Sequence, residues 1–223
     1  MIAVALATFV VFVFALLPWR SGATTTRCEK IDGDCPHCAH PWLAGQSPVA
    51  EVHLSNESAL VAGARKADAT IRALDQGAGH IQRFDDPGTG LHTSLFYFCC
   101  HSSQEVGRMK DALRAMRWAS FDVHYDDFSC NLDHDKKTVY LHALPSNQTL
   151  LFRWARTVEG ALARANVTCH HPRKSKFHMT LARVSPAYPV DFAVATLSGT
   201  DFGTHKLCSF VFEGEHFYAY DCK

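Results

Sequence analysis

The sequence lacks an excess of charge of either sign. Its 223 residues include 22 Lys and Arg against 22 Asp and Glu, so the formal net charge is zero. Proteins that coat long nucleic acids depend on many Lys and Arg contacts to phosphates, so this balance argues against that class and against DNA as a partner. If the substrate is a nucleic acid, we expect it to be short or to be held at one end.

The sequence also lacks an apolar run of the ~20 residues that a transmembrane helix needs. The uncharged run Ile2–Leu17 is shorter, and the small residues Ser21, Gly22 and Ala23 follow it at positions that a signal peptidase reads. We therefore predict a cleaved signal peptide over residues 1–23, a secreted protein, and no stable membrane association after cleavage. An uncleaved anchor is the alternative.

Cysteine is plentiful, and together with three N-glycosylation acceptor tripeptides it favours the secretory pathway. The tripeptides begin at Asn56, Asn147 and Asn166, where we expect helices to begin or end at the surface. The nine cysteines are an odd number, so at least one thiol is free or pairs between chains. They are Cys28, Cys35, Cys38, Cys99, Cys100, Cys130, Cys169, Cys208 and Cys222.

The segment Cys35–His40 contains two cysteines and two histidines, which are side chains that bind Zn²⁺. The four side chains are packed too tightly in sequence to surround a metal easily, and an oxidising compartment favours disulfides. We favour disulfides here and keep a small zinc-dependent module as the alternative. Residues 24–47 then form a cysteine-containing extension, and residues 48–223 form the main domain.

The main domain is predicted to have an α+β fold with one sizeable core. Its helices are indicated by apolar side chains at spacings of three and four, and its strands by short runs of β-prone residues. The predicted helices are Glu57–Gln76, Ser103–Trp118 and Gln148–Ala165. The predicted strands include Val49–Leu54, Phe121–Phe128, Thr138–Leu144 and a β-prone run within Cys208–Tyr220.

Two further strands each carry a histidine two residues before a hydroxyl side chain. The pattern His-x-Ser/Thr occurs four times in the sequence, and about two matches are expected by chance. The matches at His53 and His101 lie where strands end, whereas His92–Ser94 and His178–Thr180 lie inside apolar strands. Side chains alternate along a strand, so each histidine shares a face with its hydroxyl residue. Two such pairs across a cleft would supply two proton-transfer groups and two hydrogen-bond donors.

The run Phe177–Arg183, with the sequence Phe-His-Met-Thr-Leu-Ala-Arg, resembles the second signature of the two-histidine (2H) phosphoesterases. This superfamily contains bacterial RNA 2′,5′-ligase-like proteins and eukaryotic cyclic phosphodiesterases. The run Leu91–Leu95 resembles its first signature, and the likeness extends over roughly Val49 to Tyr220. One departure is Phe177, since the family often has proline there. The resemblance implies a bilobal fold with two antiparallel sheets flanking a central cleft, helices on the outside, and one motif from each lobe.

The resemblance also implies that His92 and His178 are catalytic and that Ser94 and Thr180 bind the substrate. Imidazoles titrate near neutral pH, so one can take a proton from water while the other protonates the departing ribose oxygen of a 2′,3′-cyclic phosphate. The hydroxyls would donate hydrogen bonds to the non-bridging oxygens. This scheme needs no cofactor and no metal, and no carboxylate adjoins either histidine in the sequence.

We therefore expect a metal-independent phosphodiesterase that acts on a nucleotide or an RNA 3′ end. The alternatives are a 3′–5′ RNA exonuclease of the same superfamily and a secreted nucleotide- or RNA-binding protein without turnover. Basic side chains in the loop His170–Lys176 could draw a phosphate towards His178. Tyr140 and His142 share a face of their strand and could contact a base or ribose, although core packing is favoured for Tyr140.

Overall fold

The computed structural model describes residues 29–30, 49–53, 59–85, 91–97, 103–133, 136–167 and 176–222. The predicted signal peptide, the segment Cys35–His40, the acceptor Asn56 and all of the loop His170–Lys176 except Lys176 lie outside these ranges. Within them, no helix is both long and apolar enough to cross a membrane.

The described part of the chain contains four helices and ten strands. The helices are α1 (Ala59–Asp75), α2 (Ser103–Ala115), α3 (Gln148–Arg164) and α4 (Val190–Leu197). The strands are β1 (Glu29–Lys30), β2 (Val49–His53), β3 (Ile81–Phe84), β4 (His92–Tyr97), β5 (Phe121–Leu132), β6 (Val139–Pro145), β7 (Met179–Val184), β8 (Gly203–Leu207), β9 (Ser209–Phe212) and β10 (Glu215–Tyr218).

The described strands form one curled sheet in the order β1-β5-β6-β7-β4-β2-β9-β10, with β3 beside β7 and β8 beside β5. Neighbouring strands are antiparallel except the short β1, which runs parallel to β5. The predicted α+β class is confirmed. The two predicted sheets are joined into one, because β4 pairs with β7 at Thr93 and Met179.

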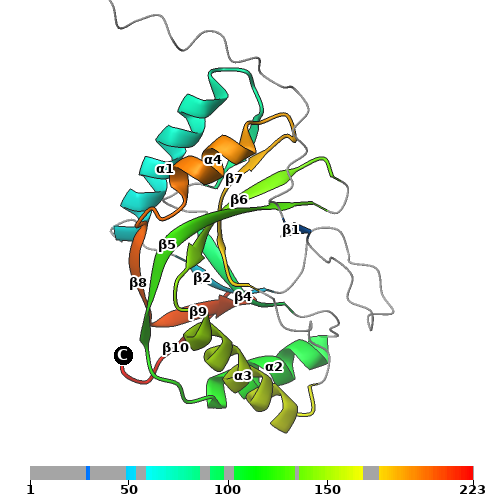
Figure 1. Ribbon diagram of the computed structural model, residues 1–223. Helices are drawn as coiled ribbons and strands as arrows, with labels where there is room; N and C mark the ends of the chain where they lie inside the picture. Colours follow the sequence, from blue (N-terminus) through cyan, green and yellow to red (C-terminus); the bar gives the residue numbers. More distant parts are fainter. Residues whose placement is uncertain are drawn as a thin grey trace, which may run out of the picture.

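The sheet has two halves, and each carries two helices on its outer side (Figure 1). Helices α1 and α4 contact each other and the half that contains β3, β5, β7 and β8. Helices α2 and α3 contact each other at the opposite end, where α3 lies against β4. The halves are interleaved in sequence, since α1 follows β2 along the chain but packs on the other half. The two signature strands β4 and β7 meet where the halves join.

Helix α1 shows why the sequence pattern predicts its helices well. Its apolar residues at spacings of three and four are buried, and they are Leu60, Val61, Ala64, Ala67 and Ile71. The helix ends at Asp75, and Gly77 and Gly79 follow with φ of 77° and 75°. Glycine adopts these positive φ values without steric cost. The Asp75 carboxylate accepts hydrogen bonds from the backbone N–H groups of Gly79 and His80, both at 3.1 Å, and fixes this turn.

Aromatic side chains fill the core of the second half. Trp154 of α3 contacts Trp118 at 5.9 Å and Phe210 of β9 at 5.0 Å between ring centroids, both edge-on. Phe210 stacks in turn on Phe217 of β10 at 5.2 Å. Such pairs contribute about 0.5–1.5 kcal/mol beyond the burial of their area. Helix α3 is thereby held against the sheet that carries β4.

Candidate active site

The two His-x-Ser/Thr pairs lie on one face of the adjacent strands β4 and β7. Thr93 and Met179 are partners in the ladder, and both side chains are buried. Because side chains alternate, the flanking residues point to the opposite face. His92 is the first residue of β4, and His178 immediately precedes β7. His92, His178 and Thr180 are partly exposed, whereas Ser94 is buried at 9% exposure, so the structure brings the two predicted pairs together with three of their four residues reaching solvent.

The antiparallel register arranges the four side chains as two diagonals. Counting outward from the partners Thr93 and Met179, His92 lies on the Thr180 side and Ser94 on the His178 side. The two histidines are therefore in a diagonal relation, for which Cα atoms in a regular ladder are about 7–8 Å apart. A phosphate group between them would meet an imidazole from each side and a hydroxyl from each strand.

A buried hydrogen bond holds β4 in place on the face opposite to His92 and Ser94. The Oγ1 atom of Thr93 lies 2.5 Å from the phenol oxygen of Tyr125 on β5. Burial raises the pKa of Tyr125 to about 12, and the hydrogen bond with Thr93 opposes part of that rise. The phenol therefore stays neutral at physiological pH and continues to pair with Thr93. This contact holds the residue between His92 and Ser94 in place.

The backbone before His178 is held by one glutamine. The Phe177 N–H donates to Oε1 of Gln148 at 2.9 Å, and Nε2 of Gln148 donates to the Phe177 carbonyl at 3.0 Å. Phe177 is also buried, with its ring 5.0 Å from that of Phe152. Proline has no backbone N–H and could not make the first of these bonds. Phe177, at the position where the resembled signature often has proline, thus has a partner, Gln148, which the sequence reasoning missed.

A third histidine lies directly beside the site. His142 of β6 pairs with Thr180 in the ladder, its Nδ1 lies 3.3 Å from Thr180 Oγ1, and its ring centroid is 4.0 Å from that of His178. It is only 1% exposed, whereas Tyr140 on the same face is partly exposed. The preference for Tyr140 as the core residue of this pair was therefore wrong. β7 lies beside β6 here, and the His178 ring packs against His142.

An irregularity in β7 brings a cation to the same face. The ladder pairs His142 with Thr180 and Leu141 with Ala182, so one residue of β7 is extra at this point. The shift in alternation puts Arg183 opposite Tyr140, with its guanidinium carbon 5.3 Å from the centre of the Tyr140 ring. Within the described ranges, Arg183 Nε is buried and has no hydrogen-bond partner. The sequence pattern alone would have placed Arg183 on the opposite face from Thr180.

In the described ranges, no group of three or more His, Cys, Asp or Glu side chains could hold a metal ion. Lys176 is exposed just before the second motif. The rest of the basic loop and the segment proposed as a zinc module lie outside the described residues.

Comparison with known proteins identifies similar solved structures. No protein-family model matches the sequence, and no curated protein matches it either. The fold is similar to that of Kluyveromyces marxianus Usb1 with uridine monophosphate, with 12% identity over 77% of this chain and 98% of the other, at a TM-score of 0.53. It is also similar to a phosphoesterase with 17% identity, 78% and 94% coverage and a TM-score of 0.52. Escherichia coli LigT complexed with 3′-AMP is similar too, with 17% identity over 78% of this chain and 95% of the other, at a TM-score of 0.51. At sequence identities of 12–17%, this similarity shows that the folds are alike and no more.

Proposed function

We propose that this chain, whose fold is that of the 2H phosphoesterases, is a phosphodiesterase that hydrolyses 2′,3′-cyclic phosphates of nucleosides or RNA 3′ ends. The observation that carries the proposal is the meeting of His92–Ser94 and His178–Thr180 on one face of β4 and β7. Neither pair alone indicates this activity, because His-x-Ser/Thr often occurs by chance. Together they present two imidazoles and two hydroxyl groups on one face of the sheet.

The proposed reaction divides two proton transfers between His92 and His178. One imidazole takes a proton from water as it attacks phosphorus, and the other gives a proton to the departing ribose oxygen. Each such role contributes about 10²–10⁴-fold to the rate. Ser94 and Thr180 donate hydrogen bonds to the non-bridging oxygens, where negative charge accumulates. The four side chains supply this acid–base chemistry without a metal ion.

The proposed substrate is a nucleotide or the end of a short RNA. The zero net charge argues against a long polyanion as the ligand, because such binding depends on many Lys and Arg contacts to phosphates. Two of the similar structures contain uridine monophosphate and 3′-AMP, which are nucleotides of the same size as the proposed product. Arg183 adds one positive charge to the face that carries Thr180.

The proposal includes secretion. Its support is the predicted signal peptide, the disulfide between Cys208 and Cys222, and an exposed acceptor at Asn147. The Asn147 side chain also caps α3 by accepting a hydrogen bond from Leu150 N–H at 3.3 Å. When the full chain is expressed in eukaryotic cells, the protein should be secreted into the medium, and its mass should fall after glycosidase treatment. Retention of the protein in the cell without glycans would contradict this part of the proposal.

The test is turnover of the four nucleoside 2′,3′-cyclic monophosphates by the purified mature protein in EDTA. His92→Ala and His178→Ala should each lose about 10²–10⁴-fold in kcat. His216→Ala is the matched control, because His216 is exposed on β10 and should leave kcat unchanged. Activity that requires added metal, or that survives both active-site substitutions, would refute the mechanism.

The same proteins distinguish the alternatives. Shortening of a short RNA from a free 3′ hydroxyl, without turnover of cyclic mononucleotides, would indicate the exonuclease. Nucleotide binding that depends on His92 and His178, with no turnover of either substrate, would indicate a binding protein.

A further inference from the structure

His142 occupies a position that the two-histidine scheme does not use. It is the buried neighbour of both members of the second pair, because it hydrogen-bonds to Thr180 and packs against the ring of His178. The ring of Tyr140, two residues earlier on β6, lies nearly parallel to that of His142, with 6.2 Å between ring centroids and 4° between planes. Because His142 is only 1% exposed, it has little room to rotate. It can therefore fix the orientation of the groups that it contacts.

The direction of the hydrogen bond decides what Thr180 can do. If Nδ1 of His142 is bare, it accepts the Thr180 hydroxyl proton, and that proton is unavailable to a substrate. If Nδ1 carries a hydrogen, it donates to Thr180 Oγ1, and the hydroxyl proton is free to point towards a phosphate. Only the second arrangement lets Thr180 act as a hydrogen-bond donor to a non-bridging oxygen.

We propose that His142 is a positioning residue that donates its Nδ1–H to Thr180 Oγ1. It thereby directs the Thr180 hydroxyl proton towards the substrate phosphate. This inference rests on the proposed function, because it assigns Thr180 the role of a phosphate donor. His142 itself does not touch the reacting atoms in this arrangement.

The first test is a double-mutant cycle in the mature protein with a 2′,3′-cyclic nucleotide as substrate. Thr180→Ala should lower kcat by about 10²–10³-fold, the loss typical of one missing oxyanion donor. His142→Leu should lower kcat by at least tenfold, and the double variant should be no slower than the slower single variant. Residues that act as a unit show such non-additivity. Losses that multiply, or full kcat in His142→Leu, would overturn the proposal.

Conservative variants separate positioning from general stability. In His142→Asn, the side-chain amide nitrogen lies close to the place of Nδ1 and can still donate, so this variant should recover part of the kcat lost in His142→Leu. The chain also provides a matched pair away from the site, since His124 Nδ1 lies 2.8 Å from Thr204 Oγ1 between β5 and β8. His124→Leu should keep wild-type kcat. If His142→Asn is as slow as His142→Leu while its melting temperature equals that of the wild type, the donor role is wrong.

A second measurement does not depend on turnover. The ¹⁵N chemical shifts of the imidazole distinguish a nitrogen that carries hydrogen from a bare one. In the wild-type protein, Nδ1 of His142 should carry the hydrogen, and a bare Nδ1 would overturn the proposal whatever the activity. If the wild-type protein shows no turnover but carries hydrogen on Nδ1 of His142, the result would contradict the proposed function and still support the proposed hydrogen bond to Thr180.

Discussion

At the scale of single residues, the second motif depends on contacts made just before it. His178 follows Phe177, whose backbone N–H and carbonyl both bond to the side chain of Gln148 at the start of α3. A buried backbone group without a partner costs about 1–3 kcal/mol. By pairing with both backbone groups of Phe177, the Gln148 amide avoids this cost. Gln148 joins the first turn of α3 to the position of the proposed catalytic imidazole.

Gln148→Met should therefore impair both stability and catalysis. Methionine has a similar length but offers neither donor nor acceptor, so we expect a loss of about 1–3 kcal/mol in the free energy of unfolding. We also expect kcat to fall with little change in KM, because His178 would lose its fixed backbone. Chemical denaturation and steady-state kinetics on a cyclic nucleotide measure the two effects. The acceptor tripeptide at Asn147 remains intact in this variant.

Gln148→Glu provides the matching control. A carboxylate still accepts from the Phe177 N–H but cannot donate to the Phe177 carbonyl, so its effects should lie between those of wild type and Gln148→Met. A Gln148→Met protein with wild-type kcat would show that the two hydrogen bonds between the Gln148 side chain and the Phe177 backbone do not position His178.

At the scale of elements, α1 packs closely against the segment that leads into β8. A Cβ atom added at Gly63 would collide with the backbone of Phe202, including its carbonyl oxygen. The other contacting atoms are also backbone, so they cannot move aside as the end of a side chain could. Glycine at this point allows α1 to lie against the sheet at short distance.

Gly63→Ala should destabilise the protein although alanine is the better helix former. Overpacking costs about 1–3 kcal/mol, which exceeds the ~1 kcal/mol gained from helix propensity. Gly107→Ala in α2 is the control, because nothing lies near its added Cβ and it should raise stability by about 0.5–1 kcal/mol. Urea denaturation of both variants measures the difference. Equal effects of the same sign would contradict the close approach.

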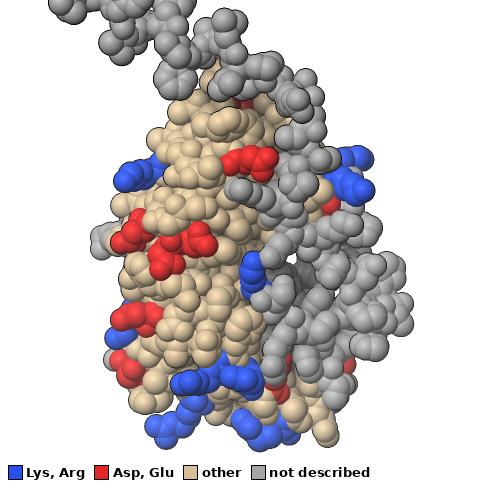
Figure 2. All heavy atoms as spheres, in the orientation of Figure 1, with Lys and Arg blue, Asp and Glu red and all other residues tan. Residues whose placement is uncertain are grey.

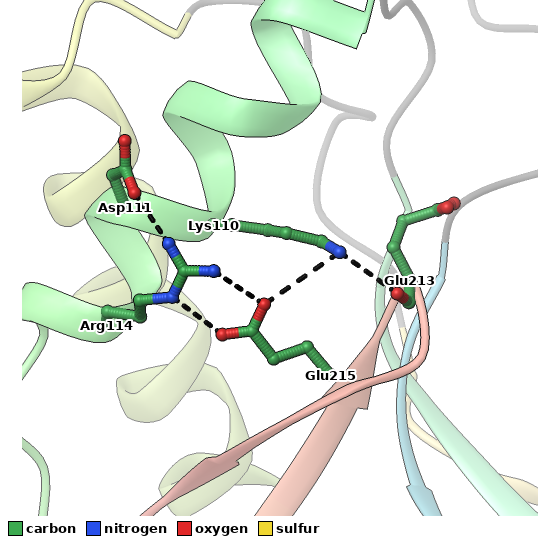
Figure 3. A network of polar contacts seen from close by, with 5 residues as sticks. All are labelled: Lys110, Asp111, Arg114, Glu213 and Glu215. Atoms are coloured by element: carbon green, nitrogen blue, oxygen red, sulfur yellow. Dashed lines mark hydrogen bonds and ion pairs between the residues drawn. The ribbon is translucent and has the colours of Figure 1, made fainter.

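A charged network joins α2 to the hairpin of β9 and β10 (Figure 3). The Arg114 guanidinium donates to both carboxylate oxygens of Glu215 at 2.7 and 2.8 Å and also to Asp111 at 2.7 Å. Lys110 donates to the Glu213 carbonyl at 3.1 Å and lies 3.8 Å from Glu215. The hydrogen bond from Arg114 is the main reason that the pKa of Glu215 lies below its ordinary value of 4.5.

The lowered pKa of Glu215 predicts how its contribution depends on pH. A carboxyl group with a lower pKa in the folded state stabilises the fold above the unfolded pKa and loses that contribution as pH falls through the folded pKa. Glu215→Gln should therefore be less stable than wild type near pH 7, and the difference should shrink as the pH falls below 4.5 and disappear below the lowered pKa of the folded state. Thermal unfolding of both proteins across this range measures it, and a constant difference would contradict the ionic origin.

At the scale of the whole molecule, the net charge is zero, but the charged side chains are unevenly distributed over the surface. Figure 2 shows basic side chains gathered at the lower end of one face, over α2 and α3, and acidic side chains gathered higher, over β5. The exposed residues include Arg108, Arg153 and Arg156 on these helices and Asp122 and Asp127 on the strand. The composition excludes a uniformly basic protein, but it does not describe this separation.

The C-terminal part of the chain is closed by a disulfide between Cys208 and Cys222, which are 14 residues apart. Cys130 is disulfide-bonded as well. The pair of substitutions Cys208→Ser and Cys222→Ser should lower the free energy of unfolding by about 3 kcal/mol, as expected for a loop of this length. Kinetics should be unchanged, because neither residue lies on β4 or β7. Unchanged stability in denaturant would show that the bond contributes nothing to the fold.

The helices of the fold could be predicted from the sequence where one local signal was strong. Helix α3 was expected at Gln148–Ala165 and is found at Gln148–Arg164, because its apolar spacing and its cap at Asn147 are both local. Helix α4 was missed because it is short, almost entirely apolar and begins after Pro189 without a side-chain cap. β5 continues to Leu132, beyond the predicted end at Phe128, because β6 pairs with it over that length.

The sequence by itself determined the two signature strands and the face that each pair of side chains shares, since alternation along a strand is a local property. Only the tertiary structure decided that Thr93 meets Met179, that an extra residue in β7 turns Arg183 towards Tyr140, and that His142 lies against His178. These relations depend on register between strands far apart in the sequence. The alternation pattern limits the possible registers, but which strands pair, and at which residues, is decided by the packing of the whole sheet.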